Sequence, residues 1–123
     1  MKEDLILKTR VRVANPIDIS RYEEIDVVID TGAAFSVIKK DRLKRIGISI
    51  IGKKRLKLAN GKVMERDYGI ACFALNGKGV GGSDVIFGEE EDVELLGLLT
   101  IEGMALSVDT TTGELKPIEL FLV

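Results

Sequence analysis

The chain opens with an alternation of apolar and charged residues that predicts a β-strand. One face would carry Leu5, Leu7, Thr9, Val11 and Val13, and the other Lys8, Arg10 and Arg12. The turn signal Asn15-Pro16 ends this strand. A second strand is predicted from Tyr22 to Ile29. Because its end, Val27-Val28-Ile29, is apolar on both faces, it should lie inside the fold.

The middle of the chain predicts a short strand, a short helix and a hairpin. The strand spans Phe35 to Ile38, and the helix spans Lys39 to Ile46. Asn60-Gly61 lies between two strand-like runs, residues 55–59 and 62–66. An Asn-Gly pair in this position is a strong signal for a β-hairpin, because both residues accept the positive φ angles of a tight turn.

The second half continues with short strands separated by turns. Strands are predicted over residues 68–75, 83–87, 105–108, 114–116 and 118–123, with a loop over 79–82 and a short helix over 98–104. The acidic run Glu89–Glu94 is typical of a solvated turn, which we favour over a metal site. An apolar run meets Gly97 much as an earlier one meets Asp30-Thr31-Gly32, a faint internal echo of two similar halves.

Many short strands with one or two small helices predict a mostly β protein, either a closed barrel or a sandwich. The 123 residues, 46% of them apolar, suffice for one core, so we expect a single domain over residues 1–123. The formal net charge is −2, and no basic stripe of the kind that nucleic-acid binding needs is present. No apolar run approaches the roughly 20 residues of a membrane span. The charged start is unlike a signal peptide. We therefore expect a cytoplasmic protein without nucleic-acid or membrane partners.

The absence of histidine narrows the possible chemistry. It excludes Ser-His and Cys-His nucleophilic sites and the common zinc arrangements. The single cysteine, Cys72, lies in the apolar run Ile70-Ala-Cys-Phe-Ala-Leu75, which favours a buried structural thiol. Catalysis would have to use carboxylates, lysines, hydroxyls or this cysteine, and we expect no metal or cofactor.

One aspartate stands out because an apolar strand leads directly into it. Asp30-Thr31-Gly32 by itself is an ordinary turn sequence. However, the strand before it is apolar on both faces, and the residues after it are small and then apolar, so the turn should not lead out to solvent. An ionised carboxylate in such a place is costly unless it is hydrogen-bonded or shares a proton. This context favours a functional aspartate over a turn residue.

The stretch Val27-Val-Ile-Asp-Thr-Gly-Ala33 resembles the active-site motif of the retropepsins, the retroviral-type aspartic proteases. The Asn60-Gly61 hairpin lies where that family has its flap. Leu95-Leu96-Gly97 resembles the family's apolar-apolar-Gly motif, followed as there by a short helix. Together these features cover roughly residues 20 to 110. The resemblance implies a small closed β-barrel of the retropepsin type, acting as an aspartic endopeptidase on peptides or unfolded proteins.

The resemblance also implies a homodimer. Such an enzyme needs two facing aspartates, and the chain has one Asp-Thr-Gly, with Leu95-Leu96-Gly97 in the second half. A two-fold dimer would supply Asp30 twice, at a buried axis. By the same resemblance, Thr31 would cross-link the two active-site loops, and Gly32 would leave room for substrate. Ala59, Asn60 and Gly61 would form the flap tip. Ala33, Val37 and Leu95 are candidates for lining the substrate pockets, with core packing an equal alternative.

Two positions depart from the family's pattern. The viral enzymes usually have an acidic residue after Asp-Thr-Gly-Ala, where this chain has Ala34, and an arginine after the apolar-apolar-Gly motif, where it has Leu98. Those two groups pair near the viral dimer interface, so losing both leaves no charge stranded. How this dimer is locked is therefore open. The apolar stretch 118–123 and the first strand are possible dimer strands, with packing inside one chain an equal alternative.

Two other interpretations remain open. The chain could be a non-catalytic, dimeric peptide-binding or assembly module of the same fold, in which Asp30 is a structural turn residue. It could also be an unrelated small barrel with a chance Asp-Thr-Gly, which could be monomeric. Replacing Asp30 with asparagine separates an enzyme, which would lose its function, from a binding module, which would keep it. Sedimentation would show whether the protein is the monomer that an unrelated barrel could be.

Overall fold

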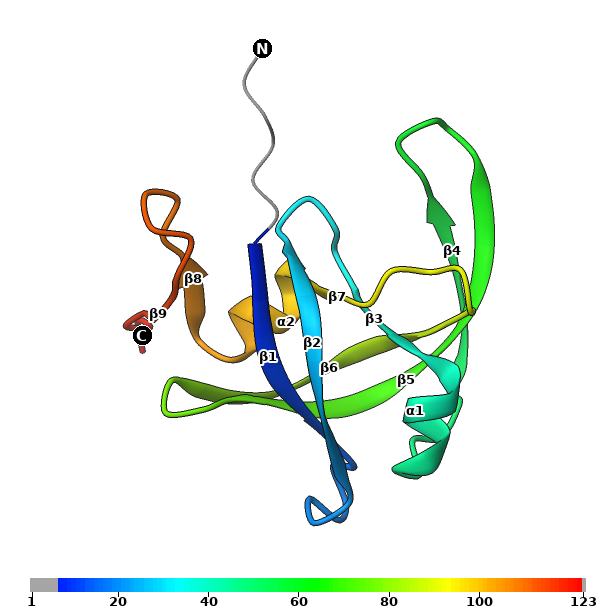
Figure 1. Cartoon of the computed structure of the whole chain (residues 1–123), viewed down its shortest axis with the longest axis horizontal. Helices are drawn as coiled ribbons and strands as arrows, with labels where there is room; N and C mark the ends of the chain where they lie inside the picture. Colours follow the sequence, from blue (N-terminus) through cyan, green and yellow to red (C-terminus); the bar gives the residue numbers. More distant parts are fainter. Residues whose placement is uncertain (1–6, 123) are drawn as a thin grey trace.

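A computed structural model describes residues 7–122 (Figure 1), so Leu5, predicted at the start of the first strand, lies outside this range. The strands are β1 Leu7–Ala14, β2 Tyr22–Asp30, β3 Ser36–Lys39, β4 Gly52–Lys57, β5 Val63–Leu75, β6 Gly79–Gly88, β7 Leu95–Gly97, β8 Leu106–Val108 and β9 Leu115–Pro117. The helices are α1 Lys40–Arg45 and α2 Leu98–Gly103. Neither is long and apolar enough to cross a membrane.

Six strands close into a barrel. Their order is β1-β2-β7-β3-β6-β5, and β5 pairs back onto β1 through residues 72–74. β4 stands outside this ring as the antiparallel partner of β5. β8 and β9 form a separate two-stranded sheet. The prediction of a mostly β fold built as a small closed barrel with two short helices is confirmed.

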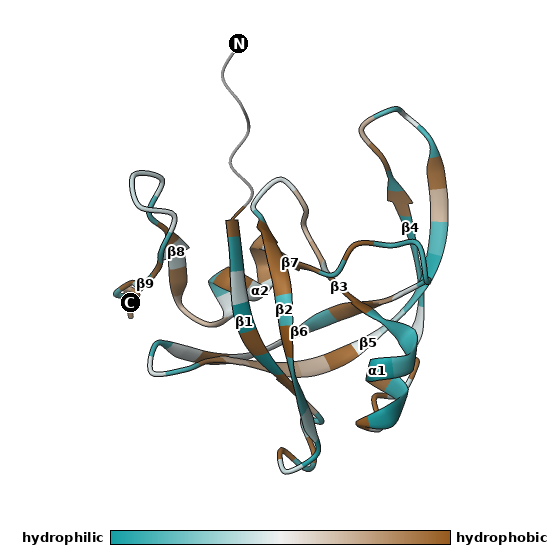
Figure 2. Cartoon of the chain, in the orientation of Figure 1, coloured by the Kyte–Doolittle hydropathy of each residue, from teal (hydrophilic) through white to brown (hydrophobic). Residues whose placement is uncertain are grey.

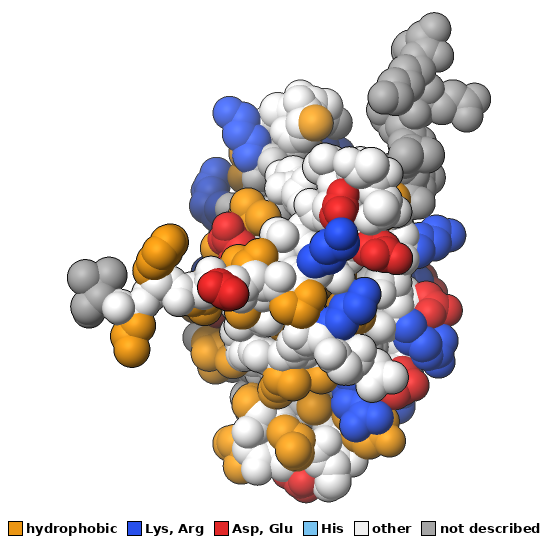
Figure 3. Space-filling view, turned by 90° about the vertical axis from the view of Figure 1, so that its left-hand side faces the viewer, with side chains coloured by type: hydrophobic (Ala, Val, Ile, Leu, Met, Phe, Trp, Pro, Cys, Tyr) orange, Lys and Arg blue, Asp and Glu red, His pale blue; other side chains and the backbone are white. Residues whose placement is uncertain are grey.

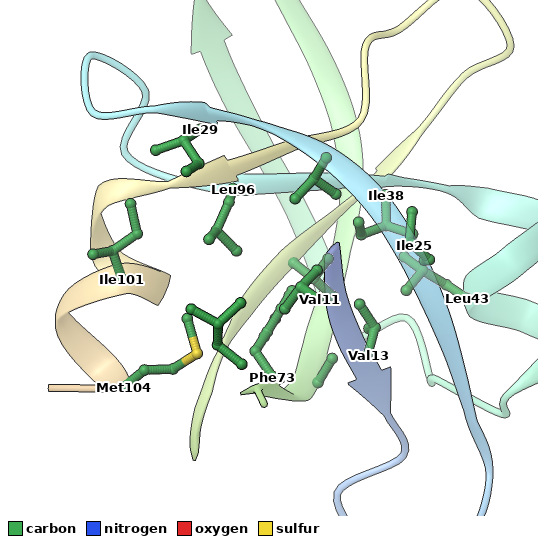
Figure 4. Packing of buried hydrophobic residues seen from close by; sticks show 14 of the residues in the cluster. Val11, Val13, Ile25, Ile29, Ile38, Leu43, Phe73, Leu96, Ile101 and Met104 are labelled. Atoms are coloured by element: carbon green, nitrogen blue, oxygen red, sulfur yellow. The ribbon is translucent and has the colours of Figure 1, made fainter. Parts of the chain in front are cut away.

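The barrel encloses an apolar core to which strands and helices both contribute. The alternation of the first strand gives the predicted result, because Val11 and Val13 are fully buried while Arg12 is exposed. Figure 4 shows these valines beside Phe73 of β5, with Leu43 of α1 and Ile101 of α2 reaching the same cluster. Figure 2 shows the complementary pattern, with apolar residues along the barrel strands and hydrophilic ones along α1.

The prediction of a loop in the glycine-rich segment 79–82 is wrong. These residues belong to β6 and pair with residues 72–75 of β5. A Cβ on Gly79 would meet the Met104 carbonyl, and one on Gly81 would overlap the Gly103 carbonyl. The glycines are therefore in a strand because the end of α2 packs directly on its backbone, a contact that local sequence does not reveal.

Two further predictions differ from the structure. The two strands predicted over 62–66 and 68–75 are one continuous strand, β5, which begins at Val63 and ends at Leu75. The predicted last strand, 118–123, is wrong over residues 118–122, which are in no strand, and Val123 lies outside the described range. The Ile118 N–H donates to the Ala105 carbonyl, 2.9 Å away, and the chain beyond it is exposed.

The turn between β8 and β9 makes stability depend on pH. Asp109 accepts hydrogen bonds from Lys116 Nζ at 2.7 Å and from the Thr111 and Thr112 N–H groups. The Lys116 ammonium, followed by these amides, lowers the pKa of Asp109 from 3.8 to about 2. Because the folded state binds this proton less tightly, the stabilisation is present above about pH 4 and is lost as the pH falls toward 2.

Asp109→Asn should remove this pH dependence while keeping a residue that suits the turn. Urea unfolding followed between about pH 5 and 2 should show wild type more stable at the upper end, with the two proteins converging at the lower end. Lys116→Met should reproduce most of the effect, because it removes the largest cause of the shift. Parallel pH curves for wild type and Asp109→Asn would contradict this account.

Candidate active site

The strand β2 ends in the segment that the sequence marks as functional. Val27 and Ile29 point into the core, and the strand stops at Asp30. The Gly32 N–H donates to Asp30 Oδ1 at 2.9 Å, and the Ala33 N–H donates to the Asp30 carbonyl at 3.2 Å. The backbone thus turns tightly around the carboxylate and orients it through its own amide.

This loop, residues 30–35 (the Asp30 loop), lies at the surface of the single chain. Asp30, Thr31, Gly32 and Ala34 are all exposed. The expectation that the turn avoids solvent is therefore wrong for one chain alone. Any burial of the Asp30 side chain would therefore have to come from another molecule.

The Asp30 loop is held in place by hydrogen bonds to β7 and to the start of α2. Asp30 pairs with Gly97 in the parallel β2–β7 ladder. The Leu98 N–H donates to the Ala33 carbonyl at 2.8 Å, and the Leu99 N–H donates to the Ala34 carbonyl at 3.1 Å. The two segments that the sequence pattern links, around residues 30 and 97, are therefore neighbours. These main-chain bonds hold the loop without using the side chains of Ala34 and Leu98.

A chain of hydroxyl groups lies behind this loop. The Gly97 N–H donates to Ser36 Oγ at 2.9 Å, Ser36 Oγ contacts Thr100 Oγ1, and Thr100 Oγ1 lies 2.9 Å from Ser83 Oγ. Ser83 Oγ in turn donates to the Asp84 carbonyl at 3.1 Å. Ser36 and Thr100 are buried, and every proton along the chain can point the same way, from Gly97 toward Asp84. The chain thereby joins β3, β6, β7 and α2 behind the Asp30 loop.

The Asn60-Gly61 hairpin is confirmed. β4 and β5 pair from Gly52↔Tyr68 to Lys57↔Val63, and residues 58–62 form the turn. Gly61 has a φ of 85°, which glycine accepts without strain. The Asn60 side-chain oxygen accepts the Lys62 N–H at 2.9 Å. Ala59, Asn60 and Gly61 are exposed at the tip of this hairpin, which extends on the same side of the molecule as the Asp30 loop (Figure 1).

An apolar pocket of about 180 Å³ lies between the hairpin and the barrel. Val37 and Leu95, both predicted to line a substrate pocket, are register partners on β3 and β7 and do line this one. The other predicted contact residues, Ala33 and the three at the hairpin tip, are not part of its lining. The remaining lining residues, which sequence analysis did not single out, are Leu56, Leu58, Met64, Arg66, Ile86, Asp92 and Val93.

The acidic run Glu89–Glu94 is a turn, as predicted, but part of it is ion-paired and only part is solvated. Glu90 and Glu91 are exposed. Three other acids contact cations, in the pairs Lys40–Glu89, Arg42–Glu94 and Arg66–Asp92. The Arg66 guanidinium holds the pKa of Asp92 below its usual value against the opposing effect of burial, and the Glu89 N–H acts in the same direction as Arg66. Among residues 7–122, no group of three or more acidic or cysteine side chains is placed to hold a metal ion.

Comparison with known proteins agrees with this geometry. A family model described as aspartyl protease matches residues 11–102, which include the Asp30 loop, the hairpin and the pocket. No curated protein matches the chain. Since the matched segment covers most of the sequence and the fold is the expected barrel, the chain belongs to the retropepsin-like aspartyl protease family.

Proposed function

We propose that the protein is an aspartic endopeptidase that works as a homodimer, with one Asp30 from each chain in a single active site. Family membership supports a peptidase. The observation that carries the finer proposal is the pairing of Asp30 with Gly97. The position beside the aspartate, in the half of the chain that echoes the first, holds a glycine. Since the sequence has a single Asp-Thr-Gly, we infer that the second carboxylate comes from a second chain.

Exposed apolar side chains support association. The first residues of α2, Leu98 and Leu99, are exposed next to the Asp30 loop, whereas the two residues that follow them, Thr100 and Ile101, are buried. Farther along, Leu120, Phe121 and Leu122 are largely or fully exposed. Figure 3 shows apolar side chains on this C-terminal segment, which projects from the body. Burying such surface against a second copy is favourable at roughly 25 cal/mol per Å², and a two-fold axis would bury the same residues twice.

The proposed chemistry uses two carboxylates and a water. As in other aspartic proteases, two carboxylates about 3 Å apart cannot both ionise cheaply, so the two Asp30 side chains would share one proton and titrate as a pair. The ionised member accepts a proton from water, which attacks the scissile carbonyl. The protonated member donates to the carbonyl oxygen as the tetrahedral species forms. Thr31 of each chain would link the two loops, and Gly32 would leave space for the peptide.

The substrate would lie extended between the Asp30 loops and the hairpins, held by main-chain hydrogen bonds. Val37 and Leu95 would contact an apolar side chain in the 180 Å³ pocket. Ala33 would contact the peptide next to the cleaved bond. Ala59, Asn60 and Gly61 would act as the flap tip that opens for binding and closes over the peptide.

Subunit mixing tests the shared site. Wild-type chains mixed with a tenfold excess of Asp30→Asn chains should lose activity by about tenfold, because nearly every wild-type chain would then sit in a mixed dimer with only one carboxylate. The measurement is the cleavage rate of an unfolded protein after the chains have exchanged partners. An excess of unrelated protein should leave the rate unchanged.

Two results would contradict an active site shared between two chains. If activity follows the amount of wild-type chain whatever the excess of Asp30→Asn, each chain carries a complete site. Sedimentation of wild type at the assay concentration gives an independent reading. An active species of monomer mass would contradict the homodimer.

A further inference from the structure

The hairpin β4–β5 projects beyond the barrel. β5 pairs with β6 only from Tyr68 onward, where Tyr68 faces Ile86. Within residues 7–122, the part of the hairpin from residue 53 to residue 67 has no strand partner other than itself. Figure 1 shows this part leaning away from the barrel. Apart from the continuity of β5 with the barrel, its position relative to the Asp30 loop therefore depends on side-chain contacts.

The inner face of the hairpin carries two cations directly opposite each other. Lys54 and Arg66 are register partners, and both side chains are mostly buried. The next register pair on the same face toward the tip, Leu56 and Met64, lines the apolar pocket. Like charges facing each other across two strands destabilise a hairpin. Each cation therefore needs its own anionic partner.

Both partners come from the body of the protein. Arg66 Nε lies 2.9 Å from Asp92 Oδ2, and Arg66 Nη2 lies 3.2 Å from Asp92 Oδ1, a bidentate pair. Asp92 Oδ2 also accepts the Glu89 N–H at 2.7 Å, which fixes its loop. This loop leads into β7, so the contact connects the hairpin to the strand that supports the Asp30 loop.

Lys54 makes the matching contact on the other strand. Its ammonium lies 3.3 Å from Asp84 Oδ2 of β6, 4.0 Å from the centre of the Tyr68 ring and 4.7 Å from that of Phe35. Cation–π contacts of this kind strengthen as the cation loses water. Phe35 is the last residue of the Asp30 loop. The hairpin is thus held to the body from both strands at one register pair, and the Arg66–Asp92 contact forms part of the pocket lining.

We propose that Lys54 and Arg66 form a two-sided clamp that sets how far the hairpin stands open over the pocket, and that they act as positioning residues for the bound peptide. This inference rests on the proposed peptidase function for its effect on substrate, but not for its effect on the hairpin. The outer-face pair Lys53–Asp67 joins the two strands of the hairpin to each other and cannot hold it to the body. Lys53 is therefore the matched control.

The test compares Lys54→Met, Arg66→Gln, the double variant and the control Lys53→Met. Methyl relaxation dispersion at Leu56 and Met64 reports motion of the hairpin face on the μs–ms scale and requires no activity. Relative to wild type, we expect increased dispersion in each single variant, a larger increase in the double variant, and no change in the control. With a peptide substrate, KM should rise about fivefold in each single variant while kcat changes by less than about twofold, since ground-state and transition-state binding weaken together.

Three outcomes decide between the possibilities. Unchanged methyl dispersion and KM in both single variants would overturn the clamp. Dispersion spread over the whole barrel, with a lower Tm, would mean that the pairs only stabilise the fold, and would also overturn it. If the hairpin methyls respond as expected but wild type cleaves nothing, the clamp on the hairpin is supported and the proposed function fails.

Discussion

Asp30→Asn is expected to reduce peptide cleavage by at least about a thousandfold, because it removes both the general base and the general acid of the proposed site. The fold should be unaffected. Asp30 is exposed, and its one side-chain hydrogen bond among the described residues comes from the Gly32 N–H, which an asparagine oxygen can accept equally well. Loss of activity with an unchanged Tm would therefore report on chemistry and not on stability.

The control for this experiment lies on the same strand. Asp26 is an exposed aspartate of β2 whose partner is Arg10, with 3.0 Å between Asp26 Oδ1 and Arg10 Nη1. Asp26→Asn removes the same charge but only an exposed ion pair, worth about 1 kcal/mol or less. We expect it to keep nearly full activity. Cleavage of an unfolded protein by purified wild type, Asp30→Asn and Asp26→Asn gives the comparison.

The pH dependence of kcat/KM is a second test that the same proteins allow. A pair of carboxylates that shares one proton is active only in the singly protonated form, so kcat/KM should be bell-shaped with pH. Cleavage by both wild type and Asp30→Asn would contradict the role of Asp30. Cleavage by neither, with both proteins folded and dimeric, would favour the non-catalytic binding module.

Local patterns account for the parts of the fold that the sequence predicts well. The alternation in β1 and the Asn60-Gly61 turn are short-range signals, and the structure has both. The alternation of the hairpin strands could also have indicated that Leu56 and Met64 share a face, since every second residue of a strand points the same way.

Long-range contacts account for what the sequence does not reveal. Gly79 and Gly81 look like loop residues until the end of α2 is packed on them. Arg66 and Asp92 are 26 positions apart, and nothing near either residue indicates that they meet. The Asp30 loop looked buried from its apolar neighbours, yet the chain turns outward after Ile29. In each case the deciding partner lies far along the chain or in another molecule.

The departures at positions 34 and 98 have a physical account. Alanine and leucine cannot form an ion pair, and the loop is held by the Leu98 and Leu99 N–H groups, which donate to the Ala33 and Ala34 carbonyls. Main-chain bonds do not depend on which side chains are present. The side chains of Leu98 and Leu99 are thereby left exposed beside the loop, at a place where a polar pair would resist association with apolar surface.

Gly97→Ala is expected to destabilise the protein by about 3 kcal/mol, which lowers Tm by roughly 10–20 °C for a chain of this size. An added Cβ would lie 2.5 Å from the Phe35 carbonyl carbon and 2.9 Å from the Ala34 carbonyl oxygen. Both are backbone atoms, so no side chain can rotate to relieve the overlap. Either β7 or the Asp30 loop has to move.

Movement of β7 or of the Asp30 loop should reduce activity as well as stability. Gly97 is the register partner of Asp30, and its N–H is bonded to Ser36 Oγ, so a displaced loop carries the carboxylate with it and breaks the hydroxyl chain. Residual folded protein should therefore show reduced kcat as well. Gly82→Ala is the matched control, because its Cβ would meet no atom closer than 4.0 Å in an exposed strand position. If thermal unfolding gives Gly97→Ala and Gly82→Ala the same Tm, the close passage of the Asp30 loop over β7 is wrong, and with it the support of the proposed active site.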